Sequence, residues 1–331
     1  MDVGFLFGWA KEQGVKVPQK PGGGANINEL FALYNEWKKK GGGKAKGDEG
    51  DIPTKDNKSS KAVDKSSKTG DNKLVLDDDA SREVYERITS DKLYELDELY
   101  ELPVFKKIEA KIGEYKQKYG VTANNSTPER ERLRKNWVQQ FLVGDGADTM
   151  PPNGKPLKKE YKATIVVGLP AAGKSTRIAN PLSEEQGAFI MDSDEMKKLI
   201  PEYRDTNGGA ANQVHDESKQ LMKRALGEFT SGSMKGTNLV IPVIGDTVKS
   251  LNDRYINNLL SAGYEVEIAY KKADAKSSAN RVVSRAIKDG RFIPREVVAG
   301  YNDNAVRNAY NTVLNADYNG KRVKMSKYSD L

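Results

Sequence analysis

The chain has 331 residues, of which 37% are hydrophobic and 31% are charged, and its mean hydropathy is -0.71. A formal net charge of +7 is spread thinly, with no run of arginines interleaved with aromatic residues, so nucleic acid is not indicated as a partner. The absence of cysteine excludes disulfides, thiolate catalysis and cysteine-based zinc sites, and the single histidine excludes a multi-histidine metal centre.

No apolar run reaches the ~18 residues that a membrane-spanning helix needs. The first ten residues lack the basic segment of a signal peptide, and their apolar stretch is short. We therefore expect a protein of the cytoplasm with no membrane partner.

The first 124 residues are predicted to hold three segments. Residues 1–40 form a small helical appendage, since apolar residues around Trp9 and Trp37 repeat at helical spacing. This appendage either docks a partner or packs on its own protein. Residues 41–75 are rich in Gly, Lys, Ser, Asp and Asn, which is typical of a flexible, disordered linker. Residues 76–124 form a helical region that Pro103 interrupts.

Residues 125–331 are predicted to form an α/β domain. Pro128 suits the first turn of a helix, which the segment 150–154 is expected to end. Strands are predicted at 163–167, 188–191, 238–241, 265–270 and 322–326, alternating with helices that include 216–230, 248–262, 276–289 and 295–314. This alternation predicts a mostly parallel sheet with helices on both faces and ligands at the carboxyl ends of the strands.

The most specific motif follows the first of these strands and fits the pattern G-x-x-x-x-G-K-[ST]. A strand, a glycine-rich loop and a helix, here expected from Lys174 to about Asn180, aim backbone N–H groups at one spot, which suits the phosphates of a nucleotide. Lys174 would reach the β- and γ-phosphates, and Ser175 would bind Mg²⁺, with Asp192 as a second ligand. ATP and Mg²⁺ are therefore the predicted cofactors, and the loop residues are Gly168, Leu169, Pro170, Ala171, Ala172, Gly173, Lys174, Ser175 and Thr176.

Two carboxylates, Asp192 and Asp194, follow the second predicted strand on the same rim as Lys174. One of them could accept a proton from a substrate hydroxyl as it attacks the γ-phosphate. Both could instead cap the next helix, for which Asp194 directly precedes the segment 195–200. The two roles can coexist.

Basic residues cluster near the end of the helix predicted at 276–289. Arg281 and Arg285 lie four residues apart, and Arg291 follows shortly after. They would either neutralise a transferring phosphoryl group from a mobile lid or form a solvated basic face. His215, beside a helix start, is interpreted as a structural hydrogen-bonding residue.

Taken together, these residues resemble the zeta toxin family of P-loop kinases over roughly residues 126–326. The resemblance rests on the segment Ser126-Thr-Pro-Glu-Arg130, the phosphate loop, the Asp192-Ser-Asp194 element, and Arg285 and Arg291 before Ile293-Pro294. It implies an ATP-dependent kinase in which Asp194 is the base and Lys174, Arg285 and Arg291 contact the phosphates. It also implies a nucleotide-linked substrate, either a UDP-N-acetyl sugar or NAD, and a toxin that an antitoxin holds.

The sequence departs from the family after the third predicted strand. Pro242 stands where the family has a sugar-contacting Glu, and Asp246 stands roughly where it has an Arg. These departures leave the identity of the acceptor open. Two alternative functions also remain: an ATP-binding adaptor that docks a partner through its N-terminal helices, and a polynucleotide 5′-kinase.

Overall fold

The computed structural model describes residues 76–329 continuously, and before them only Ala10, residues 13–17, Leu30, residues 33–34 and residues 36–37. The chain divides into two compact units, Met1–Asp71 and Asn72–Leu331. In the first unit, the described side chains of Ala10, Leu30 and Tyr34 are buried together. Most of the predicted appendage and the whole of the predicted linker at 41–75 lie outside the described residues.

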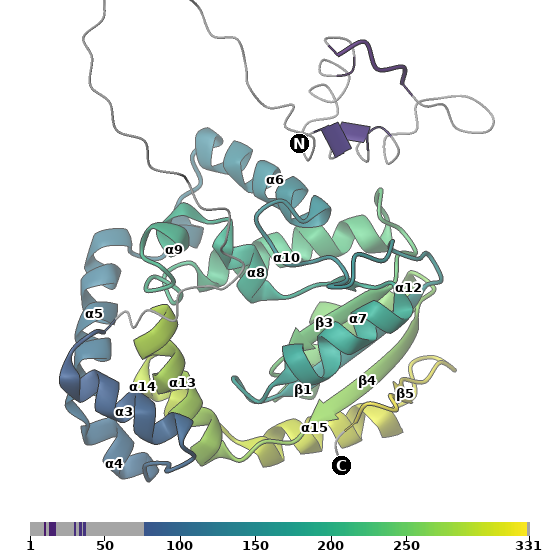
Figure 1. The fold of residues 1–331 in the computed structure, drawn as a ribbon. Helices are drawn as coiled ribbons and strands as arrows, with labels where there is room; N and C mark the ends of the chain where they lie inside the picture. Colours follow the sequence, from purple (N-terminus) through teal and green to yellow (C-terminus); the bar gives the residue numbers. More distant parts are fainter. Residues whose placement is uncertain are drawn as a thin grey trace, which may run out of the picture. The chain divides into compact units, whose positions relative to one another are not determined.

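The second unit is built on a parallel sheet (Figure 1). Within residues 76–329 the strand order is β2-β3-β1-β4-β5, with β1 (Lys162–Gly168), β2 (Phe189–Ile190), β3 (Leu239–Val243), β4 (Glu265–Lys271) and β5 (Lys324–Met325). Ala163 of β1 pairs with Leu239 of β3 on one side and with Val266 of β4 on the other, and all the strand pairs described are parallel. The predicted α/β fold with a mostly parallel sheet is confirmed.

Helices cover both faces of this sheet (Figure 1). Because successive side chains of a strand point to opposite faces, each central strand contributes to two cores. Ile165 and Val167 enter the larger core. That core is shared with α6 (Pro128–Val143), α8 (Ser193–Lys198), α10 (His215–Thr230), α11 (Val248–Leu251), η3 (Asn252–Ile256), α12 (Asn257–Ser261) and α15 (Asp303–Asn315). Val166 points the other way, into a smaller core under α7 (Asn180–Gln186), which Figure 1 shows lying over the sheet.

The region before the sheet domain is a layer of three helices, α3 (Asp79–Thr89), α4 (Leu96–Glu101) and α5 (Pro103–Tyr119). Their apolar side chains share one core with α13 (Ala275–Asp289) and α14 (Arg295–Ala299). Asn280 of α13 is fully buried and exchanges two hydrogen bonds of 3.0 Å with the backbone of Tyr94. This layer is therefore packed directly against α13 (Figure 1).

Two helix boundaries differ from the sequence prediction. The single helix predicted at 295–314 is wrong, because α14 ends at Ala299, Gly300 follows as its C-cap, and Asn302 caps the start of α15 by accepting from Ala305 N. The helix that begins at Pro128 ends at Val143, well before the proline pair, because Gly144 adopts a left-handed φ of 70°. Short-range capping chemistry sets both ends. Among the described residues, no helix is both long and apolar enough to cross a membrane.

Candidate active site

The phosphate loop leaves β1 at Gly168 and turns through left-handed backbone at Ala171 and Gly173. A side chain at position 168 would lie 2.7 Å from the carbonyl oxygen of Lys271, so the loop passes this neighbouring strand only as glycine. Without nucleotide, the Lys174 ammonium donates to the carbonyls of Gly168 and Leu169, both at 2.8 Å. The loop is thus closed over its own lysine.

The helix after the loop is longer and less regular than predicted. Its first turn, η2 (Ser175–Ala179), is a π-helix in which Asn180 N donates to Ser175 O, and α7 then continues the helix to Gln186. Pro181 explains the irregularity, because it cannot donate the hydrogen bond that a regular α-helix would direct to Arg177. The hydroxyls of Ser175 and Thr176 lie at the exposed start of this turn.

Asp192 and Asp194 lie where β2 leads into α8, as predicted. Asp192 is the N-cap, and its Oδ1 accepts from Asp194 N at 2.9 Å. The capping role falls to Asp192 alone, since the helix begins at Ser193 instead of after Asp194. Burial, and then the neighbouring Asp194, raise the pKa of the Asp192 carboxyl to about 6. A bound cation would relieve this cost.

The residues present fit the predicted Mg²⁺. A hydroxyl at Ser175 and a carboxylate at Asp192 are hard oxygen donors, and Mg²⁺ commonly takes one or two protein ligands and completes its shell with phosphate oxygens and water. Across residues 76–329 and the few described before them, no group of three or more histidine or acidic side chains is placed to hold a metal by itself. The donor set therefore suits a cation that arrives with a nucleotide.

Asp194 is held by two cations. Its Oδ2 lies 2.7 Å from Nη1 of Arg291, and its Oδ1 lies 3.2 Å from the ammonium of Lys197. Burial alone would raise the pKa of the Asp194 carboxyl, but Arg291 and then Lys197 outweigh it and keep that pKa well below its usual range. Asp194 is thus an ionised carboxylate with both oxygens engaged.

The predicted arginines divide into two groups. Arg285 lies on α13 and, together with Arg291 and Asp194, lines a cavity of about 460 Å³. Arg281, one turn earlier, is exposed and does not border this cavity. Within the described part of the chain Arg285 has no ion-pair partner, so it is available to an anion.

The charges of Asp192, Asp194, Arg285 and Arg291 also act on the pKa of Lys174. Burial lowers the pKa of its ammonium to about 8, while Asp192 and Asp194 act in the opposite direction. Lys174, the two carboxylates and the arginines Arg285 and Arg291 therefore form one electrostatic group.

Sequence reasoning missed two side chains of this group. Tyr203, on α9 (Pro201–Asp205), lines the cavity with Arg285 and Arg291, and burial raises the pKa of its phenol. Lys197 is buried beneath Asp194. A lysine three residues after an aspartate on one helix was the available signal, since residues three apart share a face.

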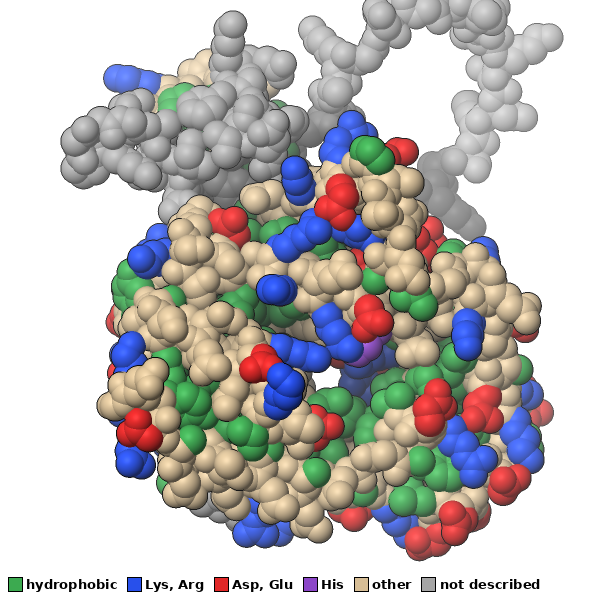
Figure 2. All heavy atoms as spheres, turned by 180° about the vertical axis from the view of Figure 1, so that it is seen from behind, with side chains coloured by type: hydrophobic (Ala, Val, Ile, Leu, Met, Phe, Trp, Pro, Cys, Tyr) green, Lys and Arg blue, Asp and Glu red, His purple; other side chains and the backbone are tan. Residues whose placement is uncertain are grey.

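A second cavity, of about 700 Å³, opens beside Ser193, which stands between the two aspartates. Its lining carries three basic side chains, Lys219 and Lys223 of α10 and Arg254, and two acidic ones, Asp246 and Asp253. Lys219 is paired with Asp216 at 3.1 Å. Figure 2 shows this face of the molecule hollowed, with Lys and Arg side chains, the single histidine and some acidic side chains at the edge. The remaining lining residues include His215, Pro242, Ile244, Thr247 and Tyr255.

The two departures from the family pattern both line this second cavity. Pro242 tolerates its place in β3 because β2 pairs only as far as Val240, so its missing N–H costs no hydrogen bond on that edge. Asp246 is exposed in the loop after the strand. His215 also borders the cavity, and burial lowers the pKa of its imidazole, so it is neutral near pH 7.

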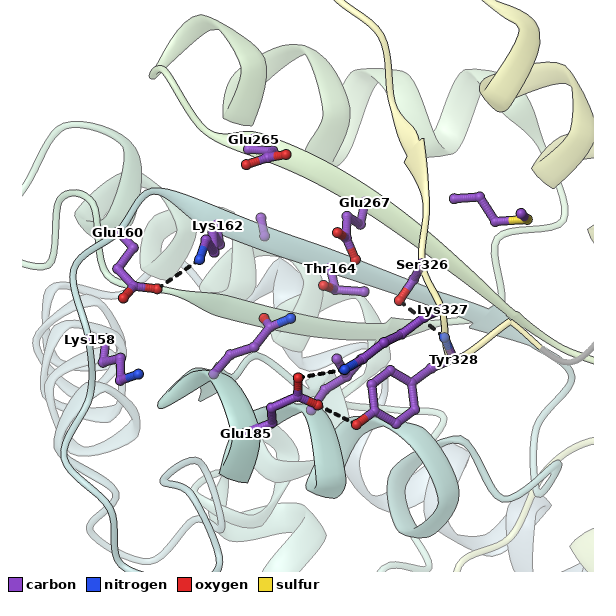
Figure 3. A pocket seen from close by; sticks show the side chains of 14 residues that line it. Lys158, Glu160, Lys162, Thr164, Glu185, Glu265, Glu267, Ser326, Lys327 and Tyr328 are labelled. Atoms are coloured by element: carbon purple, nitrogen blue, oxygen red, sulfur yellow. Dashed lines mark hydrogen bonds and ion pairs between the residues drawn. The ribbon is translucent and has the colours of Figure 1, made fainter.

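A third cavity, of about 600 Å³, lies at the amino-terminal half of β1 and β4, far along the strands from the phosphate loop (Figure 3). Its charges neutralise one another. Glu160 pairs with Lys162 at 3.1 Å, and Glu185 pairs with Lys327 at 2.6 Å and accepts from the Tyr328 hydroxyl. These pairs account for four of the charged side chains that Figure 3 labels, and the cavity lies apart from the phosphate loop.

A buried ion network supports the helices around the second cavity. Glu217 of α10 is fully buried and accepts from Arg130 at 2.6 and 2.9 Å and from Arg134 at 2.7 Å. Arg130 also makes a paired contact with Glu202 of α9 at 2.9 and 3.0 Å. Arg130 of α6 thus links α9, which carries Tyr203, to α10, which carries His215.

A parallel sheet with a glycine loop closed over a lysine, a carboxylate beyond the next strand and arginines opposite defines the P-loop nucleotide-binding class of α/β proteins. The chain belongs to the zeta toxin family, whose model matches residues 149–327. No curated protein matches it.

Among solved structures, one is described as the PezAT chromosomal toxin-antitoxin system of Streptococcus pneumoniae. It shares 21% identity at a TM-score of 0.38, over 48% of this chain and 62% of that chain. A structure described as AvrRxo1-ORF1:-ORF2 with ATP shares 22% sequence identity at a TM-score of 0.42. The match covers 58% of this chain and 62% of that chain. The same complex with sulphate ions shares 22% sequence identity at a TM-score of 0.35. That match covers 48% of this chain and 50% of that chain. The matches thus span half to three fifths of those chains.

Proposed function

We propose that this chain is an ATP-dependent kinase that transfers the γ-phosphoryl group to a hydroxyl. The single observation that supports this most strongly is the meeting of Lys174, Asp194 and Arg291 at the carboxyl edge of the sheet. The charge of Asp194 acts to raise the pKa of the Lys174 ammonium, and Arg291 is ion-paired to Asp194 at 2.7 Å. Phosphoryl transfer requires cations around the phosphates and a carboxylate that orients the nucleophile, and this cluster contains both.

The residues divide the work as follows. Backbone N–H groups of the loop Gly168–Thr176 and the Lys174 ammonium bind the β- and γ-phosphates. Arg285 and Arg291 spread positive charge over the transferring group. Asp194 orients the acceptor hydroxyl and takes its proton, while the oxygen of that hydroxyl forms the new bond to phosphorus and ADP leaves.

Mg²⁺, when bound with ATP, neutralises charge on the β- and γ-phosphate oxygens. Ser175 and Asp192 would hold it. Asp192 has one oxygen committed to the helix cap, which fixes the orientation of the carboxylate.

For the acceptor, we propose an anionic, nucleotide-linked compound of the UDP-N-acetyl sugar or NAD kind. The second cavity supports this, since its volume of about 700 Å³ suits such a molecule and its wall carries Lys219, Lys223 and Arg254. Pro242 supplies no carboxylate to a sugar, and Asp246 opposes a diphosphate beside it. The proposal therefore places the acceptor phosphates at Lys219 and Lys223 of α10.

Family membership supports a further proposal, that the kinase is toxic to the cell that makes it and that an antitoxin neutralises it. Expression of the wild type should then arrest growth, while Asp194→Asn should not. Equal growth of cells that express the wild type and Asp194→Asn would contradict the toxic role. The kinase activity would then be tested separately, by the assay below.

The decisive assay incubates the protein with γ-labelled ATP, Mg²⁺ and a panel of UDP-sugars and dinucleotides, and identifies the labelled product by mass. Asp194→Asn and Lys174→Met should abolish labelling. Arg285→Ala should lower it at least tenfold, whereas Arg281→Ala, a matched change one turn away at a residue that does not line the cavity, should leave it unchanged. A protein that binds no ATP, or an Asp194→Asn variant with full activity, would refute the proposal.

A further inference from the structure

The second cavity has two chemically different sides. Lys219 and Lys223 lie on α10, and the proposed acceptor phosphates lie with them. The side formed by the end of β3 and by η3 carries apolar surface instead, with Pro242, Ile244 and Tyr255 on its lining. Phosphates account for the basic side alone, so the apolar side suits a different part of the acceptor.

Ile244 is held at the phosphate loop with its side chain in the open. Its carbonyl oxygen accepts from Gly168 N at 3.0 Å, and the residue is 39% exposed. Gly245 then turns the chain through a left-handed φ of 72°, where a side chain would lie 2.4 Å from Val167, so the turn requires glycine. A single exposed isoleucine is ordinary on a protein surface. This one differs because its backbone is fixed to the phosphate loop and its side chain lines a cavity.

Tyr255 is presented to the same cavity by an irregular helical turn. It lies in η3, a π-helix, and such turns occur often at functional sites. The first residue of the turn, Asn252, accepts from the Tyr318 hydroxyl at 2.9 Å, which anchors it. Burial raises the pKa of the Tyr255 phenol, Arg254 lowers it, and Asp192 raises it further. The phenol is therefore within electrostatic reach of the carboxylates of the proposed active site.

We propose that Ile244 and Tyr255 form a subsite for a planar heteroaromatic ring of the acceptor, and that they make the enzyme selective for acceptors in which such a ring accompanies the phosphates. Tyr255 offers an aromatic face for stacking, and Ile244 and Pro242 offer apolar contact. Asp246, two residues after Ile244 on the same lining, can accept from an N–H group of the ring. The inference rests on the proposed function, because it takes the second cavity as the acceptor site.

The test uses small compounds that combine a phosphate with a ring, namely UMP, AMP, GMP and nicotinamide mononucleotide. Ribose 5-phosphate is their ring-free counterpart. Mg²⁺ and the β,γ-imido analogue of ATP first fill the nucleotide site, and isothermal titration calorimetry then measures the binding of each probe. One mononucleotide at least should bind roughly tenfold more tightly than ribose 5-phosphate, and the preferred one identifies the kind of ring.

Variants locate this preference at the two side chains. Tyr255→Leu should weaken binding of the preferred mononucleotide by roughly fivefold or more and leave ribose 5-phosphate unchanged, because only the stacked ring is lost. Tyr255→Phe keeps the ring and should bind within about twofold of the wild type. Ile244→Asn should also weaken the mononucleotide, whereas Val121→Asn, a matched change at an exposed residue that does not line the cavity, should not. Thermal unfolding verifies that each variant is folded.

The side-chain methyl group of Ile244 gives a readout that a purely structural role would not move. In protein with ¹³C-labelled isoleucine methyl groups, the NMR signal that is absent from Ile244→Val is assigned to this residue. The preferred mononucleotide should shift the signal through its ring current, and ribose 5-phosphate should not. An unshifted signal, no preference for any mononucleotide, or a Tyr255→Leu variant that loses affinity for ribose 5-phosphate equally would overturn the inference.

Failure of the kinase proposal is distinguishable from failure of this one. If the ATP analogue does not bind, the kinase proposal falls, and the same probes are measured without it. Ring-dependent binding that Tyr255→Leu removes would then still support the subsite. If labelled product forms from γ-labelled ATP but mononucleotides and ribose 5-phosphate bind equally, the subsite is refuted and the kinase proposal stands.

Discussion

The charge state of Lys174 should make ATP binding fall at alkaline pH. Burial lowers the pKa of this ammonium to about 8 in the free protein, against an ordinary value near 10.5. Bound phosphates favour the protonated form, so binding raises this pKa. The affinity for ATP is therefore highest below pH 8, the pKa of Lys174 in the free protein being about 8. It declines as pH rises above that value and levels off above the pKa that Lys174 has in the ATP complex.

The size of the effect follows from that pKa. At pH 8 about half of the free protein lacks the proton, so binding should take up ~0.5 proton per ATP. At pH 10 only ~1% of the free protein carries it, so affinity should be roughly 100-fold weaker than at neutral pH, or about 2.7 kcal/mol. The phosphates do not contribute to this change, since their last pKa is near 6.

Isothermal titration calorimetry in buffers of different ionisation enthalpy measures both the affinity and the proton uptake. Lys174→Arg is the matched control, because a guanidinium remains charged across this range and should bind with little dependence on pH. Lys174→Met should bind weakly at every pH. A wild-type affinity that is constant from pH 7 to 10, or an arginine variant with the same decline, would refute the reasoning.

Three further predictions concern stability, measured by urea unfolding. Glu217→Ala leaves two buried arginines without their shared partner and should cost about 3–5 kcal/mol, and a loss below 1 kcal/mol would contradict a buried network. Asn280→Ala removes both bonds to the Tyr94 backbone and should cost about 1–3 kcal/mol, which an unchanged midpoint would exclude. Gly209→Ala places a methyl group 2.3 Å from the Tyr115 ring and should cost about 1–3 kcal/mol, whereas a neutral effect would mean that the ring moves freely.

The parts of the fold that sequence reasoning predicted are those with strong local signals. The apolar, β-branched run at 163–167 and the glycine loop after it predicted β1 and the turn that follows it, because both depend on neighbouring residues alone. The break between α14 and α15 was missed because apolar periodicity continues through it, while a glycine C-cap and the Asn302 N-cap end one helix and begin the next.

The pairings among the predicted site residues could not be read from the sequence. Asp194 and Arg291 are 97 positions apart in sequence, so their 2.7 Å contact depends on how α8 and the segment after α13 pack in three dimensions. The burial of Lys197 likewise follows from α6, α9 and α10 closing around α8. Sequence spacing indicates which residues share a helix face, but tertiary packing determines which of those faces is buried.

The sequence suggested that the segment carrying Arg285 and Arg291 could be a mobile lid. In the structure the helical layer at 79–119 packs against this segment. Leu76 N donates to Ile287 O at 3.2 Å, and the ring of Tyr115 stacks on Phe292, directly beside Arg291, with centroids 6.4 Å apart. A lid fixed by a buried core is costly to swing as a body, because its apolar surface would return to water. The segment that carries Arg291 also passes close to Gly208, where a side chain would lie 3.3 Å from Cα of Arg291. The helical layer thus holds the residues on both sides of Arg291 in place through Ile287 and Phe292.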